Sequence, residues 1–278
     1  MALYRQIFQR EITAAGTVPD SHRIPLHQAV SYRLIAIFLL QRYNIFSVNL
    51  ARDEIISYLC TMKAQFLIAA PMSGSGKTTI ARGLMALLVQ KGYIVQPFKC
   101  GPDYIDTKFH EAVCGRPSIN LDTFMATPEH VRELFEHYGK AADVCIVEGM
   151  MGLFDGYDRE RGSSYEIARV LDIPVVLVVD AKSAAYSMAA LLSGFINFKK
   201  DVRIAGVIFN KVGSERHFAM LQQVCTDLGV ECLGYLPKDV SLEQGSRYLG
   251  LDFSENMEHQ SLIKILEEHV RWQELLAL

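Results

Sequence analysis

One stretch, Phe66–Thr79, constrains the fold of this chain more than any other, and it reads FLIAAPMSGSGKTT. Its first five residues are apolar without alternation, which is typical of a strand buried on both faces of a parallel sheet. The small residues 73–76 follow, and after Lys77 apolar residues return at helical spacing. A strand, a glycine-rich loop and a helix start are the context in which a G-K-[ST] sequence binds phosphate. The stretch therefore predicts a nucleoside triphosphate site, although Pro71 stands where the pattern usually has its first glycine.

The residue types of this loop each predict a role. The glycines let backbone N–H groups close around phosphate oxygens, and the positive end of the helix adds to the attraction. Lys77 is placed to reach the β- and γ-phosphates, and the Thr78 hydroxyl is placed to hold Mg²⁺. The predicted ATP-binding residues of the loop are Ser73, Gly74, Ser75, Gly76, Lys77, Thr78 and Thr79.

The composition indicates a folded protein and argues against several classes. Half of the 278 residues are hydrophobic and 21% are charged, which is enough for a sizeable core. The net charge of −3 argues against a broad nucleic-acid surface, which needs clustered Lys and Arg. The six cysteines form no CxxC pair, as is typical of a reducing compartment. The apolar run 34–40 is too short for a membrane span and too deep in the chain for a secretory signal, so we expect a cytoplasmic protein with no membrane partner.

Residues 1–61 differ from the rest of the chain. They contain six arginines and no lysine, whereas all twelve lysines lie in 62–278, and Met62 directly precedes the first predicted strand. Apolar residues in this extension predict one or two helices, and none of its residues belongs to a chemical motif. Two interpretations stay open: an appended helical element, or translated upstream sequence before a true start at Met62.

From Met62 onward, strand and helix patterns alternate. Further strands are predicted at 93–98, 143–147, 174–179, 204–209 and 232–235, and helices near 128–138, 165–171, 184–195 and 216–228. Thr127, Pro128 and Glu129 are the start signal of one helix. The alternation predicts an α/β fold of the P-loop NTPase type, with a mostly parallel sheet and helices on both faces. We expect 62–255 to be the ATP-binding domain and 256–278 to be a C-terminal helix, amphipathic from 261 on.

Ligands of such sheets bind beyond the carboxyl ends of the strands, so the candidate residues are those that follow each strand. Four side chains with a charge or a ring follow the second strand: Lys99, Asp103, Tyr104 and Asp106. They indicate either a ligand site or a solvated turn without a ligand. The third strand ends in Glu148, a Walker-B-like arrangement that predicts Mg²⁺ coordination directly or through water. After the fifth predicted strand, the side-chain amide of Asn210 is placed to hydrogen-bond the edge of an adenine. The alternative is that Asn210 lies in a turn and its amide bonds its own backbone.

Six longer motifs carry a family resemblance: APMSGSGKTT, FKCGPDYIDTKFH, NLDTFM, VEGMMGLFDG, PVVLVVDAKSAAYSMAALLSGF and GVIFNKVGSERH. With them, residues 62–251 resemble the synthetase domain of the cobyrinic acid a,c-diamide synthases, relatives of dethiobiotin synthetase and cobyric acid synthase. The resemblance implies a dethiobiotin synthetase-like fold and a reaction. ATP phosphorylates the a- and c-acetate carboxylates of a corrinoid, and ammonia then displaces phosphate to give amides.

The resemblance also implies roles for single residues. It implies a catalytic set of Lys77, Lys99, Asp103, Asp106 and Glu148. It implies metal ligation by Thr78, Asp103 and Glu148, substrate contacts by Tyr104 and Asp155, and ATP and Mg²⁺ as the bound cofactors. Ammonia normally comes from a glutaminase domain or subunit with a cysteine and a histidine. No such pair is recognised in this sequence, so we expect 256–278 to begin a linker to an absent glutaminase domain.

Two departures from the family pattern and several alternatives remain. Thr107 stands where the family usually has proline, and the sequence 246–251 replaces a typical Glu-Arg-His-Leu-Gly-Leu. The acceptor stays open between cobyrinic acid, another tetrapyrrole such as nickel sirohydrochlorin, and a dethiobiotin-like carboxylate. A nucleotide-switch ATPase of the partitioning type is the non-enzymatic alternative, but such proteins usually carry a lysine where Met72 stands here. The sequence also leaves a homodimer open.

Overall fold

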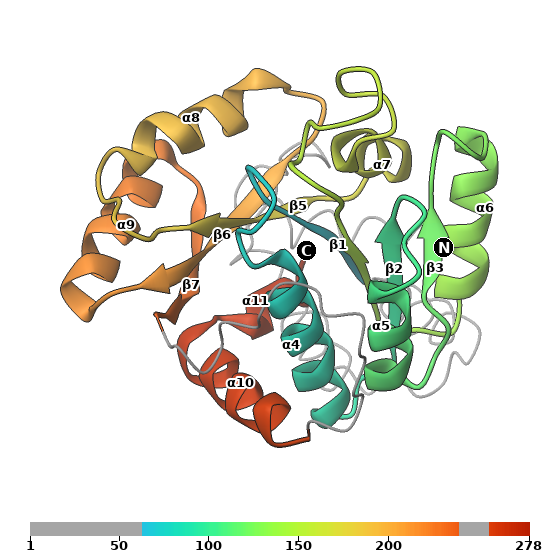
Figure 1. Ribbon diagram of the computed structural model, residues 1–278, viewed down its shortest axis with the longest axis horizontal. Helices are drawn as coiled ribbons and strands as arrows, with labels where there is room; N and C mark the ends of the chain where they lie inside the picture. Colours follow the sequence, from blue (N-terminus) through green and yellow to red (C-terminus); the bar gives the residue numbers. More distant parts are fainter. Residues whose placement is uncertain (1–62, 239–255) are drawn as a thin grey trace, which may run out of the picture. The chain divides into compact units, whose positions relative to one another are not determined.

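The computed structural model describes residues 63–238 and 256–278, shown in colour in Figure 1. Its elements in chain order are β1 (Ala64–Ala69), α4 (Lys77–Gln90), β2 (Val95–Cys100), α5 (Asp106–Cys114), β3 (Ile119–Leu121), α6 (Pro128–Gly139), β4 (Val144–Glu148), α7 (Ser164–Leu171), β5 (Val175–Asp180), α8 (Met188–Phe198), β6 (Ile204–Val212), α9 (Glu215–Leu228), β7 (Glu231–Pro237), α10 (Asn256–His269) and α11 (Trp272–Leu275). The predictions for residues 1–61, for the segment 246–251 and for a domain boundary near 255 fall outside the described residues and stay predictions.

The described strands form one sheet in the order β3-β2-β4-β1-β5-β6-β7, and all neighbouring pairs are parallel. β1 lies in the interior of this sheet, with β4 on one side and β5 on the other. The loop that follows β1 therefore emerges at the carboxyl edge between two inner strands, where ligands of such sheets bind. The predicted parallel α/β fold is confirmed.

Strand β1 explains why the sheet has a hydrophobic core on each face. Successive side chains of a strand point to opposite faces. The consecutive residues Phe66, Leu67 and Ile68 therefore face opposite sides in turn, and all three are fully buried. Phe66 and Ile68 belong to the core that α4, α10 and α11 complete, whereas Leu67 belongs to the core beneath α6, α7, α8 and α9. Figure 1 shows these two groups of helices on opposite sides of the sheet. Burial on both faces accounts for the unalternating apolar runs in the sequence.

The C-terminal helix pattern is interrupted in the structure. The sequence predicted one amphipathic helix over 261–278, but α10 ends at His269 and the short α11 begins at Trp272. Between them Val270 forms an isolated bridge with Gly234 of β7, and Arg271 donates its backbone N–H to Leu233 O at 2.8 Å. Gly234 permits this approach, because a Cβ there would lie 2.1 Å from the carbonyl oxygen of His269. Pairing with the strand therefore ends the helix.

The part of the chain that the structure describes contains no helix that is both long enough and apolar enough to cross a membrane. The five cysteines of that part are free thiols. Burial raises the pKa of Cys100, which ends β2 beside the site, to about 12. A thiol in this state is not a nucleophile at neutral pH, so its role is packing.

Candidate active site

The loop between β1 and α4 has the backbone of a phosphate cradle. Gly74 and Gly76 adopt left-handed φ angles of 80° and 96°, which side chains with a Cβ rarely adopt. Ser75 is buried between them and donates its hydroxyl to Met72 O at 2.9 Å. α4 begins at Lys77, and no described side chain caps its N-terminus. The first N–H groups of α4 are therefore free to bind an anion.

Asn210, inside β6 and two residues before its last residue, is tied to this loop. Its side-chain Nδ2 donates to Ser75 O at 3.0 Å, and its Oδ1 accepts from Lys211 N at 2.9 Å. The amide thus holds the phosphate loop against β6. Its bond to Lys211 N is the local backbone bond that the sequence analysis gave as the alternative to adenine recognition. Its predicted contact with adenine is untested.

The tight contact between Gly76 and Asn210 leads to a prediction. A Cβ at Gly76 would lie 2.1 Å from Asn210 Nδ2, whereas a Cβ at Gly74 would meet nothing within 4 Å. Both glycines have positive φ, so alanine at either position carries a backbone strain of about 1–2 kcal/mol. We expect Gly76→Ala to lower nucleotide affinity and the free energy of unfolding by more than the matched control Gly74→Ala. Calorimetry of ATP binding and urea unfolding of both variants measure the difference; equal losses would contradict the role of Asn210.

Glu148 is the centre of a buried polar network beside the loop. Its side chain is fully buried at the end of β4. One oxygen, Oε1, accepts from Thr78 Oγ1 at 2.6 Å and from Lys99 Nζ at 2.9 Å, and the other, Oε2, lies 2.7 Å from His110 Nε2. Burial alone would raise the pKa of Glu148, but the hydrogen bond with His110 and the charge of Lys99 outweigh it and lower the pKa to about 2. Glu148 is therefore a carboxylate throughout the neutral pH range.

Lys99 links the strand ends of β2 and β4. Besides Glu148, its ammonium contacts Asp106 Oδ2 at 2.7 Å, and only 4% of the Lys99 side chain is exposed. Burial would lower the pKa of Lys99, but the charges of Glu148 and Asp106 outweigh it and raise the pKa above its ordinary value. Burial and the charge of Glu148 raise the pKa of Asp106, partly offset by Lys99. Asp106 is consequently the carboxylate of this network that takes up a proton most readily.

Lys77 is held in place by the loop after β4. Its Nζ donates to Met151 O at 2.5 Å, and its pKa is lowered, mainly by burial, although Glu148 acts in the opposite direction. Burying an ammonium with a neutral partner costs free energy. A phosphate group at the loop would supply the missing negative charge, so the site is arranged to favour an anion.

The structure brings together some of the sequence-predicted residues and not others. Thr78, Lys99, Asp106 and Glu148 join one network, whereas Asp103 Oδ1 accepts the backbone N–H groups of Ile105 and Asp106 at 2.8 and 2.9 Å and so stabilises the turn before α5. Tyr104 is 80% exposed beside this turn. Asp155 accepts from Gly152 N at 2.9 Å, which closes the loop after β4. Ser73 and Thr79 lie on the phosphate loop and the first turn of α4.

His110 is a member of the network that sequence reasoning left out. It is fully buried, its Nε2 donates to Glu148, and its Nδ1 lies 3.0 Å from Ser118 Oγ. The available signal was its spacing, because His110 follows Asp106 by four residues and positions i and i+4 share one face of a helix. α5, which provides this face, was not predicted.

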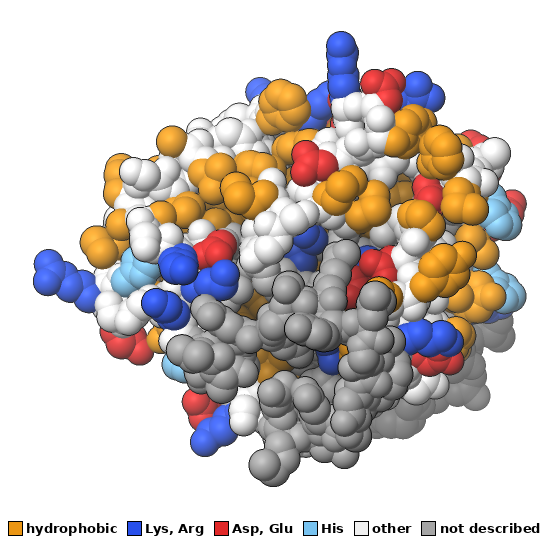
Figure 2. Space-filling view, in the orientation of Figure 1, with side chains coloured by type: hydrophobic (Ala, Val, Ile, Leu, Met, Phe, Trp, Pro, Cys, Tyr) orange, Lys and Arg blue, Asp and Glu red, His pale blue; other side chains and the backbone are white. Residues whose placement is uncertain are grey.

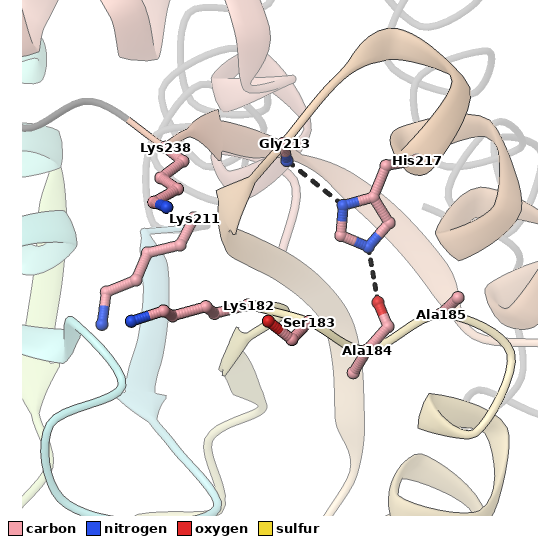
Figure 3. Close-up of a pocket in the computed structure, with 8 residues that line it drawn as sticks. All are labelled: Lys182, Ser183, Ala184, Ala185, Lys211, Gly213, His217 and Lys238. Atoms are coloured by element: carbon pink, nitrogen blue, oxygen red, sulfur yellow. Dashed lines mark hydrogen bonds between the residues drawn. The ribbon is translucent and has the colours of Figure 1, made fainter.

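A pocket of about 350 Å³ lies at the neighbouring strand ends, lined by Lys182, Ser183, Ala184, Ala185, Lys211, Gly213, His217 and Lys238. Figure 3 shows His217 bridging its two sides. Its Nδ1 accepts from Gly213 N at 3.2 Å and its Nε2 contacts Ala184 O at 2.5 Å, which together specify the neutral tautomer with a proton on Nε2. Lys211 pairs with Asp180 at 2.8 Å. Because Asn210 contacts Ser75, the pocket adjoins the phosphate loop.

The residues of the site suit a magnesium ion in one respect. Within the described residues no three His, Cys, Asp or Glu side chains form a ready metal cluster. Mg²⁺ does not require one, since it commonly takes one or two protein oxygens together with nucleotide phosphates and water. The Thr78 hydroxyl and the Glu148 carboxylate, 2.6 Å apart at the start of α4, provide such a pair of oxygens.

Comparison with known proteins gives a matching family profile and similar proteins that share one kind of name. Residues 66–250 match the sequence profile described as the CobQ/CobB/MinD/ParA nucleotide binding domain. The chain is 54% identical over 188 residues to a cobyrinate a,c-diamide synthase of Caldanaerobacter subterraneus subsp. tengcongensis, covering 67% of this chain and 41% of that protein. It is 48% identical over 204 residues to a hydrogenobyrinate a,c-diamide synthase of Brucella ovis, covering 73% and 46% respectively.

The chain thus spans less than half the length of these two relatives. Among solved structures, FtsY from Mycoplasma mycoides aligns with a TM-score of 0.46 at 16% identity, over 62% of this chain and 59% of that one. The profile match covers well over half of the chain, and the phosphate loop and Glu148 lie within it. The chain belongs to the CobQ/CobB/MinD/ParA nucleotide-binding family.

Proposed function

We propose that this chain is the ATP-dependent part of a cobyrinate a,c-diamide synthase, which activates the a- and c-acetate carboxylates of a corrinoid for amidation. The observation that carries the proposal is the contact of Glu148 with both Thr78 and Lys99, because it joins the phosphate loop to the ends of β2 and β4. The names of the relatives at 48–54% identity support the corrinoid as acceptor.

The proposed reaction has two steps. A carboxylate oxygen of the acceptor attacks the γ-phosphorus of ATP in line, the bond to the bridging oxygen breaks, and ADP leaves. The lone pair of ammonia then attacks the carbon of the resulting acyl phosphate. The bond from that carbon to the phosphate oxygen breaks, inorganic phosphate leaves, and the nitrogen gives one proton to a base. The first step is needed because an unactivated carboxylate would have to expel oxide.

The residues divide this work by their charges. Phosphoryl transfer depends on positioning and on stabilisation of charge at the equatorial oxygens. Lys77 and Lys99 supply positive charge there, and the N–H groups of Ser73–Gly76 cradle the phosphates. Asp106, with its raised pKa, is the proposed proton acceptor in the second step. Asp103 holds the turn that positions Asp106, and its predicted place near the metal belongs to this proposal.

The proposal also includes Mg²⁺, adenine and substrate contacts. Thr78 and Glu148 would hold the ion with Asp103 nearby, and a bound Mg²⁺ neutralises charge on the β- and γ-phosphates. The pocket beside Asn210 (Figure 3) is the proposed position of the nucleoside. Tyr104 and Asp155 face the acceptor in this proposal. The free thiols support a reducing compartment, as expected for a cytoplasmic enzyme.

The test is an assay with cobyrinate, ATP, Mg²⁺ and ammonium as the nitrogen source. We expect ADP formation that requires the corrinoid, together with mono- and diamide products identified by mass spectrometry. Hydrogenobyrinate, nickel sirohydrochlorin and a dethiobiotin precursor serve as competing acceptors in parallel reactions. ATP hydrolysis at the same rate without any acceptor, and no amide product, would support a nucleotide switch and refute the proposal.

A further inference from the structure

Two exposed aromatic rings lie together on the loops that follow β3 and β4. Phe124 is 70% exposed and Tyr157 is 54% exposed, and their ring centroids are 4.9 Å apart in an edge-to-face arrangement. We refer to Phe124 and Tyr157 as the aromatic shelf. Exposed apolar side chains that gather at one place commonly mark a binding surface, whereas single ones need no explanation. Figure 2 shows hydrophobic side chains gathered over α7, α8 and the strand ends between them.

The surrounding residues hold the shelf in one arrangement. The carboxylate of Glu166 on α7 accepts both from Thr123 Oγ1 and from Gly162 N, each at 2.6 Å, and thereby ties the two loops together. Gly162 has a φ of +76°, and a Cβ there would lie 2.6 Å from the ring of Tyr157. The chain thus provides a glycine beside the ring of Tyr157 and a partly buried hydrogen bond next to Phe124. Pre-ordered rings lose little conformational entropy when a ligand binds.

The shelf is connected to the reacting groups by both of its loops. Tyr157 lies on the same loop as Met151, whose carbonyl oxygen accepts from Lys77. Phe124 follows β3, where Leu121 O accepts from Gly101 N at 2.9 Å and so joins the loop that leads to Asp106, the first residue of α5. The side chain of Met151 is itself 41% exposed. The two shelf rings therefore sit on loops that also contact Lys77 and the segment leading to Asp106.

We propose that the aromatic shelf binds the ring face of a macrocyclic polycarboxylate, the corrin ring of the acceptor. This inference rests on the proposed function and adds two residues to its substrate site. A corrin has an apolar face and a rim of carboxylate side chains, so one surface must offer apolar contact and positive charge together. The guanidinium carbon of Arg161 lies 5.5 Å from the ring centroid of Tyr157. Arg161 pairs with Asp158 at 3.6 Å, but 65% of its side chain is exposed, so its remaining N–H groups can reach a carboxylate of the rim.

The size of the shelf favours a small molecule over a protein. An aromatic side chain buries at most about 150–250 Å², whereas a stable protein interface needs about 800 Å² on each partner. Two rings and one arginine match a ligand of the size of a tetrapyrrole. The attachment of both rings to loops of the candidate site has the same implication, since an acetate side chain must reach the γ-phosphate while its ring is held.

The test compares Phe124→Ala, Tyr157→Ala and the double variant with the parent chain. Equilibrium dialysis measures cobyrinate binding, and steady-state kinetics measures the KM for cobyrinate and for ATP. We expect each single variant to raise the Kd and KM for cobyrinate about tenfold, which corresponds to about 1.4 kcal/mol, while the KM for ATP changes less than about twofold. Phe124→Trp, which keeps a large ring, should retain parent affinity. Tyr186→Ala, another exposed aromatic outside the shelf, should behave as the parent.

The outcomes separate this inference from the proposed function. If the parent amidates cobyrinate and the shelf variants bind it with unchanged affinity, the shelf inference is wrong and the proposed function stands. If the parent neither binds nor amidates cobyrinate, both are wrong. A change in sedimentation coefficient with unchanged cobyrinate affinity would identify the shelf as a contact between copies of the chain and would also overturn the inference. Far-UV circular dichroism of each variant verifies that the fold is retained.

Discussion

Lys77→Ala is expected to abolish ATP-dependent turnover while leaving the fold intact. In the structure the ammonium of Lys77 is buried at the start of α4 and has Met151 O as its hydrogen-bond acceptor. The carbonyl oxygen is neutral, so the positive charge is available to the transferred phosphoryl group. Removal of such a preorganised charge typically costs about 10²–10³ in kcat. We expect at least this loss in ADP formation measured with cobyrinate as acceptor.

The stability of the variant provides the necessary control. Burial lowers the pKa of Lys77, which means that the folded protein holds the charged form at a cost when no anion is bound. Lys77→Ala removes this cost, so the free energy of unfolding without ATP should fall little or even rise. Urea denaturation with and without ATP measures both values, and the added stability from ATP should shrink in the variant. Parent-like turnover would contradict the assignment of the loop.

The sheet could be predicted from sequence because its strands are buried on both faces. Runs such as Phe66–Ala70 and 174–179 have no polar positions, and helical spacing returns between them. β3 was missed because it has three residues, two of them only partly buried, so it has no periodicity to detect. α5 was missed because its sequence, DTKFHEAVC, carries only two buried side chains, and both are polar.

The candidate site was predictable where a motif gives both residue type and spacing. Thr78 and Glu148 are 70 positions apart in the chain, yet Thr78 follows β1 and Glu148 ends β4. These two strands pair in parallel, so the meeting of the two residues follows from the sheet. His110 and Glu166 could not be predicted in this way. Each acts through a hydrogen bond to a different loop or strand, and the choice of partner depends on side-chain orientation in three dimensions. The hydrogen bonds of Asp103 to backbone N–H groups could not be predicted from the sequence either.

Glu148→Gln is expected to lower kcat by about two to three decades with a much smaller change in the KM for ATP. The substitution keeps the size of the side chain and an oxygen that accepts from Thr78, but it removes the charge that pairs with Lys99. Lys99 would keep Asp106 as its ion-pair partner. The network needs this carboxylate to stabilise charge in the transition state. Loss of such stabilisation typically costs about 3–4 kcal/mol. Single-turnover phosphoryl transfer to cobyrinate is the direct measurement.

Two companion variants separate chemistry from structure. Glu111→Gln makes the same chemical change on the exposed side of α5, where the carboxylate of Glu111 pairs with the exposed Lys108 at 3.0 Å, and should leave kcat unchanged. Asp103→Asn keeps an oxygen for the N–H groups of Ile105 and Asp106, so a loss of kcat in this variant reports the missing charge and not a broken turn. Because the pKa of Glu148 is lowered to about 2, the carboxylate is ionised across the neutral range, and the rate deficit of Glu148→Gln should not vary with pH there. If Glu148→Gln and Asp103→Asn both retained kcat and changed only the KM for ATP, these acids would bind the nucleotide without activating the carboxylate, and the acyl-phosphate mechanism would lose its support in this network.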